Sequence, residues 1–200
     1  MFPQYQRIRT ANSNAEPIYP SLFEISFVLP TIVQQKGYDP ILMLENATSI
    51  DIAQLTPTVG INEQRFKYST RAFVAMPEKT HAEFDIKFNV NEDENRSVFV
   101  YNTLRAWYDL VWNSQNGTLF YKRNMLGTII VNWHDREGFV HRRITYQNCQ
   151  ILGIEGYGDL SFESVGEIVK DVTGKFVSDY WFEERIDNNN EIVPPSVLQQ

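Results

Sequence analysis

The chain has 200 residues, of which 42% are apolar and 22% are charged, a composition typical of one globular domain with a substantial core. Its net charge of −7 argues against a protein that reads nucleic acid, because such proteins need a basic face to neutralise phosphates. No apolar run approaches the roughly 20 residues of a membrane helix, and the single cysteine, Cys149, excludes an internal disulfide. The first residues lack the apolar stretch of a signal peptide, so we expect a chain made and kept in a cytoplasm.

Polar segments stand at both ends of the sequence. Residues 1–18 are rich in Gln, Asn and Arg, and residues 185–200 contain a run of Asp and Asn followed by a pair of prolines. Such segments bury too little apolar surface to fold alone, so we predict two arms that become ordered on a partner. Residues 19–184 between them form the predicted domain.

The first half of this domain shows mainly the period of two that is typical of β-strands. Residues 41–52 are predicted as a strand, although their composition also suits a short helix. Residues 54–68, with Pro57 and Gly60, are predicted as a long extended loop, and such loops are usually functional. The strands predicted in this half are 19–29, 41–52, 67–76 and 82–90. The last of them alternates cleanly, and Phe84, Ile86, Phe88 and Val90 are predicted to point inward.

One helix interrupts the strands. Acidic residues within 91–95 suit a helix N-terminus, and Asn116-Gly117 suits the end of the segment. Between them, one stripe at helical spacing consists of Val98, Tyr101, Leu104 or Arg105, Tyr108, Val111 and Trp112.

The second half returns to strands, with a turn at 136–138 that joins two of them in a β-hairpin. Strands that surround one helix, with few β–α–β units, predict a mainly β fold: a sandwich or barrel of two antiparallel sheets with one flanking helix. The strands predicted in this half are 118–123, 127–135, 139–147, 149–155 and 172–182.

No residue pattern predicts an enzyme. His134 and His141 flank one hairpin, but no third ligand stands at a spacing typical of zinc sites. The acidic run at 92–94 is better explained by helix capping than by acid–base chemistry. The glycines at 153–158 do not open a helix, as a phosphate-binding loop would. We therefore predict no catalytic residue, no metal and no cofactor.

Aromatic residues make up 14% of the chain and gather in the closing strand. In this strand, one face carries Phe176, Ser178, Tyr180 and Phe182, and the other carries Val177, Asp179 and Trp181, so both faces need cover. A single core could absorb most of these side chains. Aromatic residues are also enriched in interfaces, which favours a self-assembling subunit. A β-sandwich module that binds a carbohydrate or another ligand through exposed aromatics is the alternative.

The order of these features resembles that of the tail tube proteins of contractile-tailed phages, which are related to the hemolysin-coregulated tube proteins of type VI secretion. The resemblance covers roughly residues 20–184. The longer segment 31–44 and the two polar arms depart from the pattern, which leaves open a specialised tube initiator or terminator. The matching motifs, in chain order, are Pro20-Ser21-Leu22-Phe23-Glu24-Ile25, Leu55-Thr56-Pro57-Thr58-Val59-Gly60, Phe84-Asp85-Ile86-Lys87-Phe88-Asn89-Val90, the aromatic helix with Trp107 to Asn113, and Asp179-Tyr180-Trp181.

The resemblance implies a structural subunit. Six copies would join their sheets edge to edge into a ring with a β-lined channel, and the rings would stack into a tube within a contractile sheath. Viral DNA would pass through the channel without sequence-specific binding. Further implied partners are sheath, baseplate and tail terminator proteins, with no membrane. The implied location is the virion tail, assembled in the host cytoplasm. The residues expected at subunit interfaces are Leu55, Pro57, Val59, Gly60, Phe66, Asp179, Tyr180 and Trp181.

Overall fold

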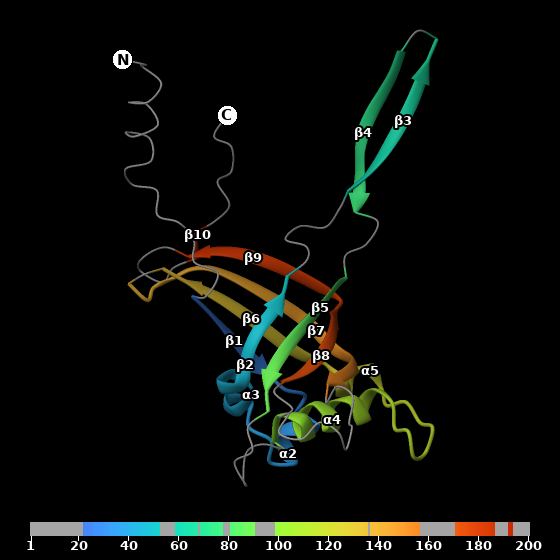
Figure 1. The fold of residues 1–200 in the computed structure, drawn as a ribbon. Coiled ribbons are helices and arrows are strands. Elements are labelled where there is room, and N and C mark those ends of the chain that lie inside the picture. The colour runs from blue at the N-terminus through green and yellow to red at the C-terminus, as the bar shows by residue number, and fades with distance from the viewer. Residues whose placement is uncertain are drawn as a thin grey trace, which may run out of the picture.

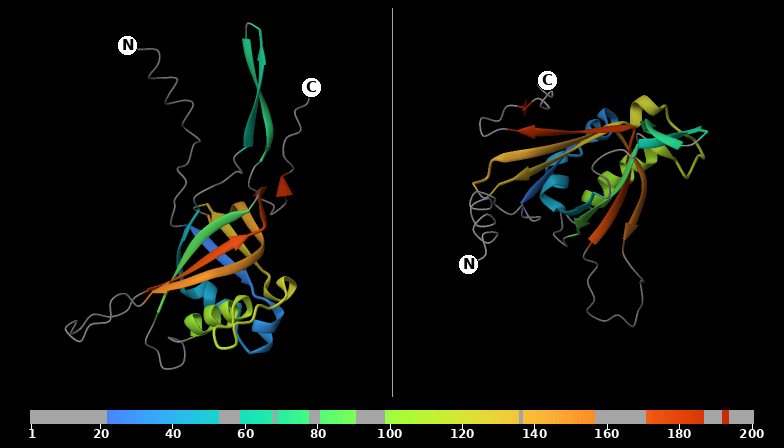
Figure 2. Two further views of the ribbon diagram at one scale, coloured as in Figure 1. Left: turned by 90° about the vertical axis from the view of Figure 1, so that its right-hand side faces the viewer. Right: turned by 90° about the horizontal axis from the view of Figure 1, so that it is seen from above.

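Eight strands form one antiparallel sheet that folds over into two packed layers, and a two-stranded hairpin stands apart from them (Figures 1 and 2). This arrangement confirms the predicted class, a mainly β fold of antiparallel sheets with a flanking helix. The residues that the computed structural model describes are 22–52, 59–67, 69–77, 81–90, 99–135, 137–156, 171–186 and 192–193.

The long strand β7 (Val140–Gly156) belongs to both layers. Its first half pairs with β6 and β9, and its second half pairs with β8. The other strands of the first layer are β1 (Phe23–Val28), β6 (Gly127–His134), β9 (Tyr180–Ile186) and β10 (Ile192–Val193). The other strands of the second layer are β2 (Ala47–Asp51), β5 (Ala82–Asn89) and β8 (Asp171–Ser178).

The chain passes between the layers at two bends that face each other. Asn148 has a left-handed φ of 55° within β7, and Asp179 separates β8 from β9. The bends are opposite because β7 pairs with β9 before residue 148 and with β8 beyond it. Asparagine enters the left-handed region more readily than most residues, so one residue suffices to redirect the strand.

The core between the layers is largely aromatic. The ring centroids of Phe84 and Tyr146 lie 4.3 Å apart, and those of Phe27 and Phe88 lie 5.8 Å apart. In each pair one ring comes from each layer. The predicted alternation in β5 is confirmed, since Phe84, Ile86 and Phe88 are buried.

Helix α4 (Phe99–Val111) closes one end of the two layers. Its Trp107 is fully buried, and the indole nitrogen donates a hydrogen bond of 2.8 Å to the carbonyl of Met125 in α5 (Lys122–Met125). The close fit requires glycine at 127, because a Cβ there would lie 2.7 Å from the indole ring. Two short helices, α2 (Thr31–Gln35) and α3 (Pro40–Asn46), add Val33 and Met43 to the core.

The hairpin consists of β3 (Val59–Phe66) and β4 (Ser69–Pro77). It lies in the sequence between β2 and β5, which are themselves an antiparallel pair. The hairpin therefore projects from the sandwich at the end where β2 stops and β5 starts (Figure 1).

Besides the predicted strands 139–147 and 149–155, which are one continuous strand, β7, four secondary-structure predictions differ from the structure. Residues 59–66 were expected in an extended loop but form β3, because they pair with β4. The first part of 41–52 is helix α3, which starts with Pro40 and is capped by the Asp39 carboxylate. Residues 118–123 form no strand: Thr118 makes an isolated bridge to Asn113, and α5 starts at Lys122.

The fourth difference concerns the closing strand, which is two strands rather than one. The bend at Asp179 shifts the alternation by one residue. Phe176 and Ser178 face the core before the bend, whereas Trp181 faces it afterwards. The expected shared face of Phe176 and Tyr180 is therefore wrong.

The domain boundaries stay a prediction. The boundary between residues 18 and 19 lies outside the described residues. At the other end, β9 continues to Ile186, and Ile192 pairs with it inside the predicted arm.

Candidate assembly surfaces

The hairpin β3–β4 exposes apolar side chains on both of its faces. Ile61 and Val74 are opposite each other and are 67% and 78% exposed. Phe66 and Phe73 belong to the other face and are about half exposed. An isolated two-stranded hairpin is marginally stable in water, so side chains of this kind favour packing against a further surface.

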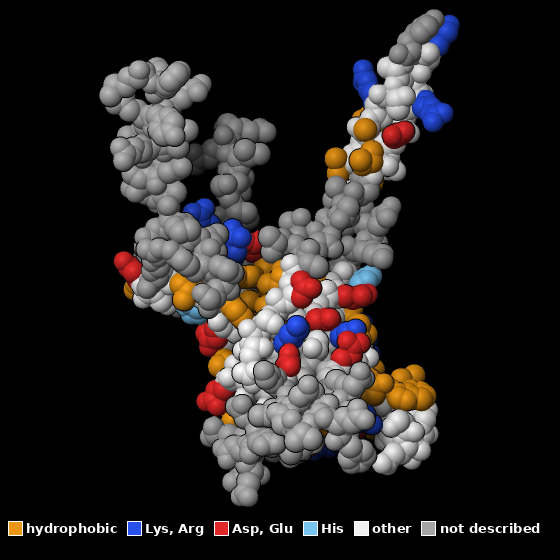
Figure 3. Space-filling model, in the orientation of Figure 1, with side chains coloured by type: hydrophobic (Ala, Val, Ile, Leu, Met, Phe, Trp, Pro, Cys, Tyr) orange, Lys and Arg blue, Asp and Glu red, His pale blue; other side chains and the backbone are white. Residues whose placement is uncertain are grey.

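The far end of the hairpin is basic. Arg65, Lys67 and Arg71 lie there, with Glu63 as the only acidic residue among the described positions of the hairpin (Figure 3). The Arg71 guanidinium lies 5.5 Å from the centroid of the Phe66 ring. The described part of the hairpin is therefore net positive, whereas the whole chain is net negative.

Strand edges form a second candidate surface. Within the described part of the chain, β1 pairs only with β6, and β2 pairs only with β5. Strand β9 pairs with β7 on one side, while its other side meets β10 only at Arg185 and Ile186. Open backbone edges are templates for pairing with another chain.

The bend between β8 and β9 is a third candidate. The Asp179 carboxylate accepts a hydrogen bond of 2.7 Å from the Lys122 ammonium, which ties the bend to α5. Tyr180 is 46% exposed. Trp181 is half-buried against the core, with its ring 6.3 Å from that of Tyr146.

The expected interface residues fall into two groups. Val59 and Gly60 begin β3 at the base of the hairpin, and Phe66 ends β3 at its far end. The second group lies in the sandwich and consists of Asp179, Tyr180 and Trp181. It is near the start of β5, because Ala82 of β5 pairs with Ser178. Leu55 and Pro57 lie outside the described residues.

Sequence reasoning missed the most exposed apolar residues. It did not identify Ile61, because the segment containing β3 was interpreted as a loop. It also did not identify Phe73 and Val74, whose segment was predicted as a strand but not as an exposed one. It also missed Leu119 and Tyr121 in the connection from α4 to α5, which are 69% and 74% exposed. The sequence carries no signal for this exposure, because it depends on where α4 and α5 pack.

The outer face of the second layer is polar. Strand β5 alternates buried apolar residues with outward polar ones. Most outward positions of its neighbours are also polar, with Val177 in β8 and Leu152 in β7 as apolar exceptions. Glu155 and Lys175 form an ion pair of 2.6 Å across β7 and β8. Acidic residues outnumber basic ones: Asp51, Glu83, Asp85, Glu155 and Asp171 stand against Lys87 and Lys175. Charged side chains of both signs gather over this part of the molecule in Figure 3.

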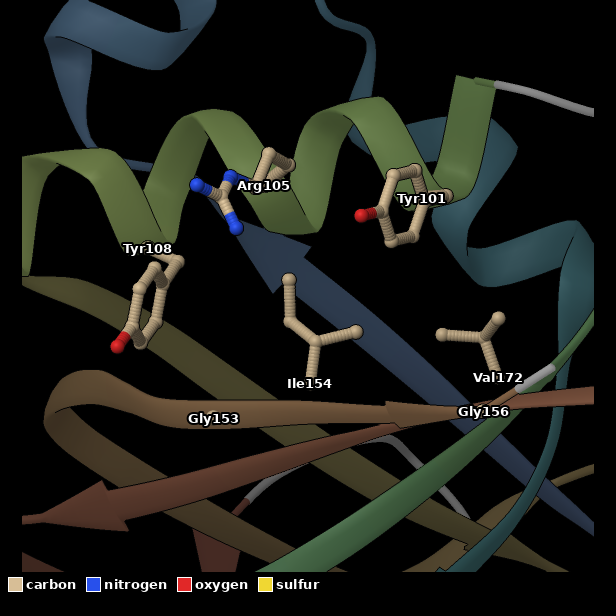
Figure 4. A pocket seen from close by; sticks show the side chains of 7 residues that line it. All are labelled: Tyr101, Arg105, Tyr108, Gly153, Ile154, Gly156 and Val172. Carbon is tan, nitrogen blue, oxygen red and sulfur yellow. The ribbon is translucent and has the colours of Figure 1, made fainter. Parts of the chain in front are cut away.

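A cleft of about 400 Å³ lies between α4 and the ends of β7 and β8 (Figure 4). Arg105 projects into it but is already engaged: it pairs with Asp109 at 3.2 Å and donates to the Ser114 hydroxyl. The cleft therefore offers tyrosine rings and aliphatic groups rather than converging acid–base groups. Its lining residues are Tyr101, Arg105, Tyr108, Gly153, Ile154, Gly156 and Val172.

Other polar groups have structural roles. The Cys149 thiol is fully buried and donates to the carbonyl of Tyr146; burial raises its pKa to about 12. His134 contacts the Gly138 carbonyl and lies 3.5 Å from Glu24. Within the described residues, no group of three or more His, Cys, Asp or Glu side chains could hold a metal.

The helices in the described ranges are all too short or too polar to span a membrane.

No known family profile matches the sequence, and no curated protein is similar to it in sequence. Solved structures are similar to it in fold. A chain of the PVC sheath–tube complex, an extracellular contractile injection system in the extended state, gives a TM-score of 0.57 at 11% identity, over 88% of this chain and 97% of that one. The tube-terminating cap of the anti-feeding prophage gives 0.57 at 12% identity, with 85% and 92% covered. The PVC sheath/tube terminator gives 0.55 at 12% identity, with 86% and 99% covered.

At these identities the similarity concerns the fold. It confirms the resemblance that the order of the sequence motifs predicted. The chain has the fold of the tube proteins of contractile injection systems.

Proposed function

We propose that this protein is a structural subunit of a contractile phage tail tube, in which hexameric rings stack around a channel for DNA. The observation that carries the proposal is the hairpin β3–β4, which holds apolar side chains away from the body with nothing in its own sandwich to cover them. A subunit with the tube fold and a projecting apolar hairpin is suited to bind further copies of itself.

The open strand edges support the closure of a ring. In this proposal the free side of β9, with Tyr180 and Phe182, meets the free side of β2 in the next copy. Backbone hydrogen bonds would then continue the sheet around the ring and remove the unpaired edges. The side chains of Tyr180 and Phe182, 46% and 37% exposed, would supply apolar contact at that seam.

The polar outer face of the second layer supports the passage of DNA. Its described residues include no exposed aromatic side chain on which bases could stack, and its acidic residues repel phosphates. In the proposed ring this face lines the channel, so that DNA slides past it without adhering.

The proposed partners are other copies of the chain and the sheath, baseplate and terminator proteins of the same tail. The chain would be assembled in the host cytoplasm and remain in the virion tail. It has a structural role, without catalysis. Because the similar folds include a tube-terminating cap, a tube terminator or initiator is the related variant of this proposal.

The test is negative-stain electron microscopy of the purified protein across concentration and salt. We expect rings or tubes with a central hole. The matched variant replaces residues 53–80 with a short flexible linker; since β2 and β5 pair directly, the sandwich should fold unchanged. This variant should form rings but no tubes. A wild-type protein that stays monomeric at high concentration, even with purified baseplate added as a nucleus, would contradict the proposal.

A ligand-binding module is the second candidate, and the cleft beside Tyr101 and Tyr108 is the observation that favours it. Calorimetric titration with oligosaccharides separates the two functions. Saturable heat that disappears in Tyr108→Ala, from a wild-type protein that forms no rings, would favour the module over the tube subunit.

A further inference from the structure

The connection between α4 and α5, residues 112–121, forms an exposed apolar protrusion. Leu119 and Tyr121 are 69% and 74% exposed, and Trp112 and Phe120 are both slightly above 40%. Hydrophobic side chains mark this protrusion at the lower right of Figure 3. The segment contains no charged residue, although the chain as a whole is 22% charged.

Hydrogen bonds fix the turn at 113–118, which directly precedes the apolar residues 119–121. The Asn113 N–H donates to the Thr118 carbonyl at 3.0 Å, and the Gly117 N–H donates to the Asn113 carbonyl at 2.8 Å. The Asn113 side chain also accepts bonds from the N–H groups of Gln115 and Asn116. An ordered apolar surface binds a partner at a lower entropic cost than a flexible loop does.

The protrusion and the hairpin lie at opposite ends of the molecule and in line with each other. In both side views the hairpin extends from one end of the sandwich, and the segment 112–121 lies at the other end (Figures 1 and 2). In the view from above, the hairpin lies over this segment (Figure 2, right). A second copy displaced along the hairpin direction would therefore bring its protrusion to the hairpin of the first.

We propose that residues 112–121 are the receiving surface for the hairpin β3–β4 of a second copy of this chain, in a head-to-tail contact. This inference rests on the proposed tube function and names the surface through which rings stack. Leu119, Phe120 and Tyr121 of one copy pack against Phe66 and Phe73 of the next.

The chemistry of the two surfaces is compatible. Both are apolar, so their contact removes from water the side chains that each leaves exposed. Residues 112–121 carry no charge, and Lys122 beside them pairs with Asp179. The Arg123 guanidinium lies 5.5 Å from the centroid of the Tyr121 ring, so the apolar contact is made mainly by Leu119 and Phe120. Arginine side chains of the hairpin can also lie over the exposed aromatic rings.

The contact joins two different surfaces, and this determines the form of the assembly. A contact between two identical patches is satisfied in a closed dimer. A contact between unlike patches at opposite ends of a subunit leaves one patch of each kind free, so further subunits can be added without limit. A tube that grows ring by ring requires the second arrangement.

The test uses two variants of the full chain. Phe66→Ser/Phe73→Ser removes the donating surface, and Leu119→Ser/Tyr121→Ser removes the receiving surface. All four side chains are substantially exposed, so both variants should fold normally, as thermal unfolding would verify. The control is Ile41→Ser/Leu152→Ser, which changes residues that are equally exposed elsewhere.

We expect each test variant to form single rings, with the association constant between rings lowered at least about tenfold, while the control forms tubes. A mixture of the two variants retains one intact interface. It should therefore form pairs of rings that grow no further, visible by electron microscopy and by analytical ultracentrifugation.

Tubes of wild-type length from Leu119→Ser/Tyr121→Ser would overturn this inference alone. A mixture that forms no more ring pairs than either variant does would overturn it too. Wild-type protein without rings or tubes would instead overturn the proposed function, and this inference with it.

Discussion

The sandwich and the hairpin use apolar residues in opposite ways. In the sandwich, large side chains such as Trp107, Tyr146 and Phe176 are fully buried. In the hairpin, Ile61, Phe66, Phe73 and Val74 are between 48% and 78% exposed. One chain thus contains a complete core and an apolar element that this core does not cover.

The difference separates folding from assembly. Burial in the sandwich stabilises the single subunit, because those side chains leave water when the chain folds. The hairpin gains little from folding and would gain its burial only from a neighbour. Substitutions in the two regions should therefore affect different measurements, and the following predictions test this separation from the largest expected effect on stability to the smallest.

The largest effect is expected where α4 closes the end of the sandwich. Trp107→Ala should lower the free energy of unfolding by about 3–5 kcal/mol, because it leaves a cavity and frees the Met125 carbonyl that the indole now bonds. Denaturant titration measures the loss. The matched control is Trp112→Ala on the same segment of chain: that side chain is 41% exposed, and its loss should be less than about half as large. Equal losses would show that α4 does not close the core as described.

A second prediction concerns alkaline pH. Burial raises the pKa of the Cys149 thiol from 9.0 to about 12 and also raises the pKa of Tyr146. Because the pKa is higher in the folded chain, the unfolded chain loses the proton at a lower pH than the folded chain does. The free energy of unfolding therefore keeps its full value below pH 9. Above pH 9 it decreases by about 1.4 kcal/mol per pH unit for one group.

Denaturant titrations between pH 8 and pH 11 measure this decrease. Cys149→Ala should have a smaller decrease over the same range, because one of the two shifted groups is gone. Identical pH dependence in the variant and in the wild type would show that the thiol is not shielded from water.

Sequence reasoning identified the sandwich better than the hairpin, and the reason is physical. Strands with one buried face show alternation, so β5 was predicted with its buried residues. The hairpin has no buried face, and therefore no alternation marked β3. The bend at Asp179 was missed because it depends on pairing: β7 changes partner there, from β9 to β8.

The candidate interface residues show the same limit. Asp179, Tyr180 and Phe66 were chosen from motif order, and their roles at an interface remain a prediction. The protrusion at 112–121 could not be predicted, since its exposure depends on where α4 and α5 pack. A sequence states that Leu119 and Tyr121 are apolar, but only the fold leaves them uncovered.

A smaller effect, of opposite sign, is expected at Ser178. Its hydroxyl is buried without a hydrogen-bond partner, and such a group costs free energy on folding. Ser178→Ala should raise the free energy of unfolding by about 1 kcal/mol, as measured by thermal or denaturant unfolding. Ser26→Ala on the outer face of β1 is a control that should change little. A loss of stability in Ser178→Ala would indicate that a water molecule satisfies the hydroxyl.

The smallest effect on stability, and the sharpest test of the comparison, belongs to the hairpin. Phe66→Ser/Phe73→Ser should change the free energy of unfolding of the dilute, unassembled chain by less than about 0.5 kcal/mol, because both rings are already half in water. At high protein concentration the same variant should unfold at a lower temperature than the wild type does, since only the wild type is stabilised by assembly. Phe88→Ser in β5 provides the contrast, with a large loss at every concentration. A hairpin variant that is strongly destabilised even when dilute would show that the hairpin packs on its own sandwich, and the division between a folding region and an assembly region would then be wrong.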